Sequence, residues 1–174
     1  MRAVDVSFNA VNGGSFRVFA THAANTAVVE SAAVAEVRAR EVAEGYATGA
    51  PFADFVARVE KQAATLLSLL RSLKAEGKVV HGYGASTKGN TLLQYLGITP
   101  EILPVIADRN EVKWGARTPG TNIPIISEAE SRDLAPDYYL ALPWHFRDGF
   151  LRREGAFRAR GGKFIFPLPE VEIV

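Results

Sequence analysis

From residue 78 onward, the chain alternates short apolar runs with stretches of helical periodicity, and this alternation restricts the possible folds more than any other feature. Strand-like runs are expected at residues 78–83, 103–107, 123–126, 138–142 and 164–166. Helical stretches are expected at residues 87–96, 127–133 and 146–160. Strands that alternate with helices are typical of a parallel sheet with helices on both faces and right-handed crossovers. The sequence therefore predicts an α/β domain over residues 77–174, with a doubly wound, Rossmann-like, mostly parallel sheet.

Two different patterns precede this domain. Residues 1–20 alternate apolar with polar or small side chains around the turn signal Asn12-Gly13-Gly14-Ser15, which predicts a β-hairpin. Residues 21–76 predict a helical connector that packs on the core; its amphipathic half begins after Pro51 and ends before Gly77. Because a lone hairpin is marginally stable in water, we expect this one to pair with another chain or to cover its own domain.

The composition excludes several classes of protein. The chain of 174 residues has no cysteine, which excludes disulfides, thiolate zinc sites and cysteine nucleophiles. Lys and Arg number 20 and Asp and Glu number 19, so the basic excess typical of nucleic-acid binders is missing. No apolar run is long enough to cross a bilayer, and the first residues do not resemble a secretory signal. We therefore expect a soluble, cytoplasmic protein that binds neither nucleic acid nor membrane.

Glycine-rich and polar segments follow the predicted strands, at the edge where open α/β sheets bind ligands. In the first segment, Gly82 and Gly84 allow a tight turn and a close approach of a ligand. Ser86 or Thr87 can cap the next helix, whose first-turn amides together with Lys88 would attract a phosphate or diphosphate. The spacing is neither G-x-G-x-x-G nor that of a P-loop. The alternative is that the glycines serve only strand–helix packing.

Five further candidates lie after later strands. Asp108 stands where an acidic residue accepts hydrogen bonds from ribose in dinucleotide folds; the alternative is a loop or capping aspartate. Thr118 and Thr121 enclose a Pro-Gly turn that either contacts a sugar or phosphate or is merely a turn. Trp144 either stacks on a sugar or base or closes the core. His145 is suited to acid–base chemistry, although a lone histidine is more often structural.

Several ordered motifs resemble one family. The segment GYGASTKGNTLL, residues 82–93, resembles the signature of the C-terminal domain of S-adenosylmethionine-dependent C-methyltransferases, which include the deoxysugar C-methyltransferases. Residues 118–125 resemble the family's T-P-G-T-x-I-P-I, residues 136–146 its P-D-Y … L-P-W-N-F, and residues 161–169 its G-G-x-F-I-x-P-L-P. Residues 13–17 resemble a G-G-S-[LF]-R element near the end of the family's catalytic domain. The resemblance spans almost the whole chain.

The resemblance implies that the chain is the C-terminal, nucleotide-sugar-binding portion of an enzyme that methylates a carbon next to a keto group. The family also has an N-terminal zinc-binding region and a central S-adenosylmethionine domain, which supplies a histidine base. The implied S-adenosylmethionine and zinc are therefore bound outside this chain, and the fragment needs no cofactor and is not catalytic by itself. The implied partners are a nucleoside diphosphate sugar and the missing methyltransferase domain. Residues 1–20 resemble the last two strands of that domain, and a homodimer through this hairpin is another expectation.

The resemblance places the strand-end residues on the substrate side, and no residue of the chain inherits the catalytic role. His145 stands where the family usually has Asn, so we assign it no catalytic function. Two other functions stay open: a stand-alone Rossmann-like nucleotide-binding or interaction module, and, less favoured, an NAD-dependent oxidoreductase. The expected substrate-binding residues are Gly82, Gly84, Ser86, Thr87, Lys88, Asp108, Thr118, Thr121, Trp144 and His145.

Overall fold

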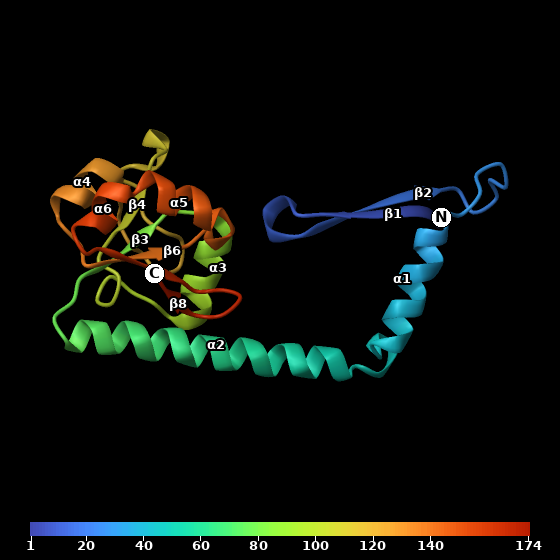
Figure 1. Cartoon of the computed structure of the whole chain (residues 1–174), viewed down its shortest axis with the longest axis horizontal. Helices are drawn as coiled ribbons and strands as arrows, with labels where there is room; N and C mark the ends of the chain where they lie inside the picture. The colour runs from blue at the N-terminus through green and yellow to red at the C-terminus, as the bar shows by residue number, and fades with distance from the viewer. The chain divides into compact units, whose positions relative to one another are not determined.

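The predicted hairpin and the predicted α/β domain both form in the computed structural model, which describes residues 1–174 (Figure 1). The chain divides into two units, Met1–Arg58 (unit 1) and Val59–Val174 (unit 2). Unit 1 contains β1 (Arg2–Asn9), η1 (Val11–Gly13), β2 (Ser15–Thr21), α1 (Ala32–Ala43), η2 (Tyr46–Thr48) and the first residues of α2 (Ala50–Ala75). The strands of unit 2 are β3 (Val80–Tyr83), β4 (Ile106–Asp108), β5 (Ile125–Ser127), β6 (Tyr138–Ala141), β7 (Lys163–Phe166) and β8 (Glu172–Ile173). Its helices are α3 (Thr87–Leu96), η3 (Glu111–Lys113), α4 (Glu128–Asp133), η4 (Trp144–Phe146), α5 (Arg147–Arg153) and α6 (Gly155–Ala159).

Unit 1 is a hairpin with one short helix against it. Strands β1 and β2 pair antiparallel, and Asn12 turns between them with a φ of 55°. The start of α1 is tied to β1, because the Ser31 amide donates to the carbonyl of Val4 at 2.9 Å and the Ser31 hydroxyl donates to Asp5 at 2.6 Å. Val4 and Val34 are the buried hydrophobic residues of this unit. The core of unit 1 is therefore very small.

Unit 2 is a six-stranded sheet in the order β5-β4-β3-β6-β7-β8. All neighbouring strands pair parallel except β7 and β8, which are antiparallel. From β3 the chain builds the sheet outward through β4 and β5, and it then crosses back to place β6 on the other side of β3. This arrangement makes the junction of β3 and β6 a topological switch point, and the predicted α/β fold is confirmed.

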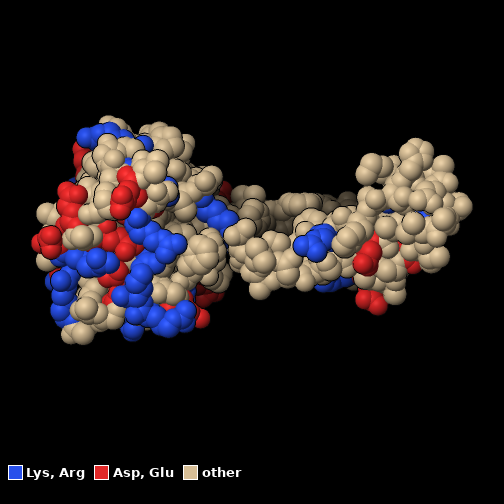
Figure 2. Space-filling model, turned by 90° about the horizontal axis from the view of Figure 1, so that it is seen from above, with Lys and Arg blue, Asp and Glu red and all other residues tan.

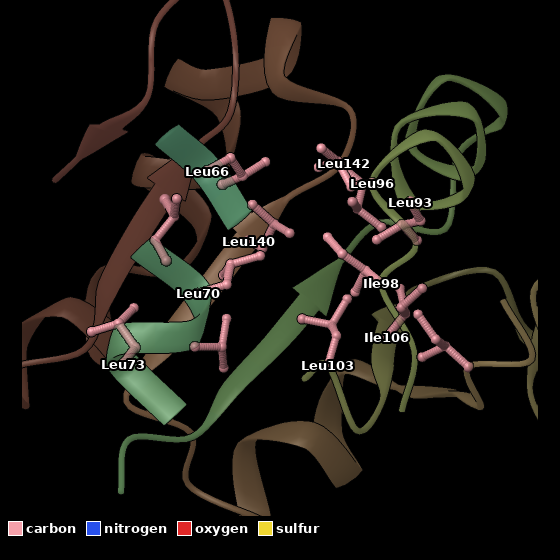
Figure 3. Packing of buried hydrophobic residues seen from close by; sticks show 13 residues of the cluster. Leu66, Leu70, Leu73, Leu93, Leu96, Ile98, Leu103, Ile106, Leu140 and Leu142 are labelled. Carbon is pink, nitrogen blue, oxygen red and sulfur yellow. The ribbon is translucent and has the colours of Figure 1, made fainter. Parts of the chain in front are cut away.

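The two faces of the sheet differ in chemistry because residues alternate along each strand. On one face, Leu140 and Ile165 pack with α2 and α3 in an aliphatic cluster, shown in Figure 3. On the other face, Tyr139 and Phe164 pack with α5 and α6 in an aromatic cluster. The buried residues of α2 lie in its second half: Leu66, Leu70 and Leu73 belong to the aliphatic cluster drawn in Figure 3.

The structure differs from the predicted elements in the helix expected over residues 146–160 and in the additional strand β8. The helix expected over residues 146–160 is divided into η4, α5 and α6, and it breaks at Glu154, whose carboxylate turns into the core. The helical stretch before residue 76 divides near the predicted boundary of its two halves, into α1 and α2, and Gly45 and Gly49 take positive φ between them. The short strand β8 was not predicted. No helix of the chain is both long and apolar enough to cross a membrane.

Candidate functional site

A cavity of about 460 Å³ lies at the carboxyl ends of β3, β4 and β6, entirely within unit 2. The cavity includes the switch point of the sheet, where doubly wound folds bind their ligands. Segments after all three strands and one side of α5 contribute to its wall. The lining residues are Gly84, Ala85, Ser86, Asp108, Arg109, Asn110, Lys113, Glu128, Pro143, Phe146, Gly149, Phe150 and Arg153.

The glycine-rich turn after β3 forms one wall of this cavity. Gly84 has a φ of +82°, and a Cβ atom there would lie 2.7 Å from Cγ of Pro143. A Cβ at Gly82 would lie 2.7 Å from Cγ1 of Ile106, so this glycine serves strand packing inside the sheet. Ser86 is the residue that caps α3, because its hydroxyl accepts a 3.0 Å hydrogen bond from the amide of Gly89. Thus Gly84 and Ser86 face the cavity, whereas Gly82 supports the turn from within the sheet.

Asp108 connects the loops that form the cavity through hydrogen bonds to its carboxylate. Its carboxylate is buried and accepts hydrogen bonds from the amides of Ala85 at 2.7 Å and Asn110 at 2.8 Å. Lys113 donates to the same carboxylate at 3.1 Å and to the carbonyl of Ala85 at 2.8 Å. These contacts agree with the alternative in which Asp108 is a loop or capping aspartate. A ribose contact by Asp108 stays a prediction.

The cavity carries more positive charge than its own carboxylates balance. Asp108 pairs with Lys113, and Glu128 pairs with Arg153 at 2.7 Å. Arg109, next to Asp108, is exposed and forms no hydrogen bond or ion pair within the chain. Arg109 and Arg153 were not selected from the sequence. The position of Arg109 directly after a strand could have revealed it, whereas that of Arg153 depends on how α5 packs.

Three of the predicted residues, Lys88, Trp144 and His145, form a second group that does not line the cavity. They lie in α3 and η4, the segments that follow the neighbouring strands β3 and β6. The Lys88 Nζ atom lies 6.0 Å from the ring centre of Trp144, and the rings of Trp144 and His145 are 6.2 Å apart. Burial and the charge of Lys88 lower the pKa of His145. The Nδ1 atom of His145 is buried without a hydrogen-bond partner, as is Oδ1 of Asn90. Both of these atoms are therefore left available for a further hydrogen bond.

The remaining predicted residues, Thr87, Thr118 and Thr121, do not line the cavity. Thr87 is exposed at the first position of α3. The hydroxyls of Thr118 and Thr121 are 2.6 Å apart, and Thr118 also accepts from the amide of Ile123 at 2.9 Å. Both threonines are buried in a turn that precedes β5, so they lie toward the amino end of that strand. Their hydroxyls stabilise the turn, and their expected contact with substrate stays a prediction.

A buried polar network extends from the cavity wall into the aromatic face of the sheet. Tyr83 donates to Glu154 at 2.8 Å and accepts from Arg153 at 2.7 Å, and Arg132 binds both oxygens of Glu154 at 2.8 and 3.1 Å. Burial raises the pKa of Tyr83 far above its usual value, so its hydroxyl stays protonated. Burial alone would raise the pKa of Glu154, but hydrogen bonds from Arg132 and Tyr83 outweigh it and lower that pKa.

A separate buried group lies on the same face of the sheet. Nδ1 of His81 is 2.8 Å from the hydroxyl of Ser131, which in turn is 3.1 Å from the hydroxyl of Tyr139. Burial lowers the pKa of His81 to about 4 and raises that of Tyr139. His81 is therefore neutral at physiological pH, and it lies in the strand, where it does not reach the cavity.

The sheet, its switch point and the cationic cavity define a Rossmann-like α/β domain with a candidate ligand site. Residues 10–169 match the profile of the family described as C-methyltransferase C-terminal domain, and the chain belongs to this family. The chain is 38% identical over 174 residues to C-methyltransferase NovU of Streptomyces niveus. The match covers 100% of this chain but 41% of the relative, so the chain spans well under half the length of that protein.

Proposed function

We propose that this chain is the nucleotide-sugar-binding portion of an S-adenosylmethionine-dependent C-methyltransferase that methylates a carbon next to a keto group. The observation that carries the proposal is the cavity at the switch point, where Arg109 is a cation without a partner among the cavity's own carboxylates. A diphosphate is the anionic group of a nucleotide sugar, and arginine is well suited to bind phosphate oxygens. The role of the chain is then to bind and orient the substrate.

The proposal places the cofactors outside this chain. The zinc expected from the family resemblance has no candidate ligand set here, because no group of three or more His, Cys, Asp or Glu side chains is arranged to hold a metal ion. The chain also has no cysteine to supply a thiolate. S-adenosylmethionine supplies the methyl group when it is bound, and in this proposal both it and the catalytic base belong to the part of the enzyme that this chain does not span. The residues of the chain hold the sugar nucleotide while proton removal and methyl transfer occur on the neighbouring domain.

The hairpin of unit 1 supports the presence of such a neighbouring domain. Phe8 and Phe16 lie across from each other on β1 and β2, with ring centres 6.4 Å apart, and both are largely exposed. Val18, on the same face of β2 as Phe16, is also exposed, and Phe19 is exposed on the opposite face. Exposed apolar side chains on a two-stranded sheet are typical of a surface that another structure covers. We propose that the remaining part of the methyltransferase covers this surface; a homodimer through the hairpin is the alternative.

Calorimetric titration of the chain with thymidine diphosphate and with NAD tests the proposed binding role. We expect thymidine diphosphate to bind and Arg109→Ala to weaken that binding by about tenfold, because a hydrogen bond to a charged group is worth about 1.5 kcal/mol or more. The affinity of Arg109→Ala should also depend less on salt, since one phosphate contact is lost. Arg152→Ala is the matched control, because Arg152 is an exposed arginine of α5 that does not line the cavity.

Two other outcomes would change the proposal. If Lys88→Ala weakens binding and Arg109→Ala does not, the diphosphate lies at the start of α3 beside Lys88 and Trp144 rather than in the cavity. Binding of NAD without binding of thymidine diphosphate would contradict the proposed function. Binding of neither compound would contradict a substrate-binding role for this chain by itself and would favour an interaction module.

A further inference from the structure

Arg153 is the cation of the cavity whose guanidinium is fixed from several sides. Nη2 donates to the hydroxyl of Tyr83 at 2.7 Å and to Glu128 at 2.7 Å, and Nε donates to the same hydroxyl at 3.1 Å. The rings of Tyr83 and Phe150 each lie 5.4 Å from the Arg153 Cζ atom. A free arginine loses side-chain entropy when it binds a ligand, and an arginine that is already held loses less.

The hydrogen bonds of the Tyr83 hydroxyl determine which neighbouring group accepts its proton and which group donates to it. A tyrosine hydroxyl has one proton, and that proton is donated to Glu154 at 2.8 Å. The lone pairs of the hydroxyl are therefore left for Arg153, which can only donate. Glu154 is in turn fixed by two hydrogen bonds from Arg132. The polar chain runs from Arg132 through Glu154 and Tyr83 to the guanidinium at the cavity.

Packing alone does not require these groups. The surrounding face of the sheet is aromatic, with Phe150, Phe157 and Phe164 in one cluster with Tyr83. Burying a carboxylate and a hydroxyl in such a cluster is unfavourable unless each is fully hydrogen-bonded, and an apolar replacement often stabilises a protein more. Glu154 also interrupts the helical segment, since α5 ends before it and α6 begins after it. The buried hydroxyl of Tyr83 and the buried carboxylate of Glu154 are therefore better explained by their fixing Arg153 at the cavity.

We propose that Tyr83, Glu128 and Glu154 are positioning residues that fix the Arg153 guanidinium at the cavity wall to receive an anionic group of the ligand. This inference rests on the proposed function for the nature of the ligand, but it concerns different residues from Arg109. Arg153 then contributes a preformed phosphate contact, and Arg109 contributes a mobile one.

The test compares two variants that each remove one buried hydroxyl from the same face of the sheet. Tyr83→Phe removes the contact with Arg153, whereas Tyr139→Phe removes a hydroxyl that bonds Ser131 and does not touch Arg153. We expect Tyr83→Phe to weaken thymidine diphosphate binding about fivefold and Tyr139→Phe to leave it unchanged. Arg153→Gln should weaken binding about tenfold, and Tyr83→Phe in that background should add little, because the two residues act together.

A second readout does not depend on the ligand. In the wild-type chain the Nε–H proton of Arg153 should exchange slowly with solvent in NMR spectra, because it donates to Tyr83. The signal should persist in Tyr139→Phe and exchange fast in Tyr83→Phe. A signal that stays protected in Tyr83→Phe, or an equal loss of binding in both tyrosine variants, would overturn the positioning role. If the wild-type chain binds no thymidine diphosphate, the proposed function fails, and the NMR comparison alone decides whether Tyr83 positions Arg153.

Discussion

The two units of this chain use large apolar side chains in opposite ways. In unit 2, Tyr139 and Phe164 are 0% exposed inside a three-layer arrangement of helices and sheet. In unit 1, Phe8 and Phe16 of the hairpin are 58% and 67% exposed. In Figure 2, charged atoms are dense over unit 2, while much of the visible surface of unit 1 is uncharged. The difference shows that unit 2 contains its own core, whereas unit 1 leaves its large apolar side chains exposed. We therefore expect unit 1 to need another structure for its stability.

The largest expected effect comes from separating the units. A chain of residues 50–174 keeps α2 and all of unit 2, and we expect it to unfold cooperatively in urea, with a midpoint close to that of the whole chain. Residues 1–58 alone should show no cooperative transition, because a hairpin with one short helix buries too little apolar surface. Residues 78–174 are the control: they lack Leu66, Leu70 and Leu73, so their transition should be lost as well. Circular dichroism during urea titration measures all three.

Sedimentation velocity on the same chains separates the two proposed partners of the hairpin. A monomeric full-length chain supports coverage by the rest of the methyltransferase. A full-length dimer together with a monomeric 50–174 chain would instead support the homodimer. If residues 1–58 prove stably folded and monomeric alone, the contrast between the units is wrong.

A smaller effect is expected from two substitutions within α2, which passes from unit 1 into unit 2. Leu70→Ala should lower the free energy of unfolding by about 2–5 kcal/mol, because the side chain is 1% exposed and its removal leaves a cavity in the aliphatic cluster. Val56→Ala, at a position 51% exposed, should change the free energy of unfolding by less than about 0.5 kcal/mol. Equal effects in denaturant titrations would show that the first half of α2 is also packed.

The smallest effect is a dependence of unit 2 on pH. Burial lowers the pKa of His81 from 6.5 to about 4, so between these values the unfolded chain takes up a proton that the folded chain excludes. Stability should therefore be complete above about pH 6.5 and decrease toward pH 4, by at most about 3 kcal/mol. His81→Gln should remove the larger part of this slope from urea titrations between pH 4.5 and 6.5; the smaller part that remains comes from His145, whose pKa is also lowered by burial and by the charge of Lys88. His22→Gln, at an exposed histidine of unit 1, should retain the full slope; a wild-type stability that does not change over this range would contradict the expectation.

Most of the sheet was predictable because each strand has a local pattern. The alternation of apolar runs and helical stretches located β3 to β7, and Ser86 was one of two predicted caps of α3. The strand β8 was missed because two residues at a sheet edge carry no periodic pattern. The break at Glu154 was missed because its cause is the distant side chain of Arg132.

The candidate site was predictable only where it follows strands directly. Gly84, Ser86 and Asp108 line the cavity as the strand-end rule suggests. Thr118 lies elsewhere, because the segment after η3 pairs back along β5 toward the amino end of that strand. Arg153 depends on tertiary packing, since it reaches the cavity through Tyr83, seventy residues earlier in the chain. No periodic pattern in the sequence indicates this contact between Arg153 and Tyr83.

The short strand β8 has a consequence for how this domain behaves at high concentration. Phe164 exchanges two backbone hydrogen bonds with Val174, at 2.8 and 2.9 Å, and Ile165 pairs with Ile173. Without these last residues, β7 would present a row of unpaired amides and carbonyls flanked by Phe164, Ile165 and Phe166. An exposed apolar edge of this kind is a template for strand addition by other copies. Loss of residues 172–174 would therefore leave the candidate cavity intact, and we expect it to make the protein prone to aggregate.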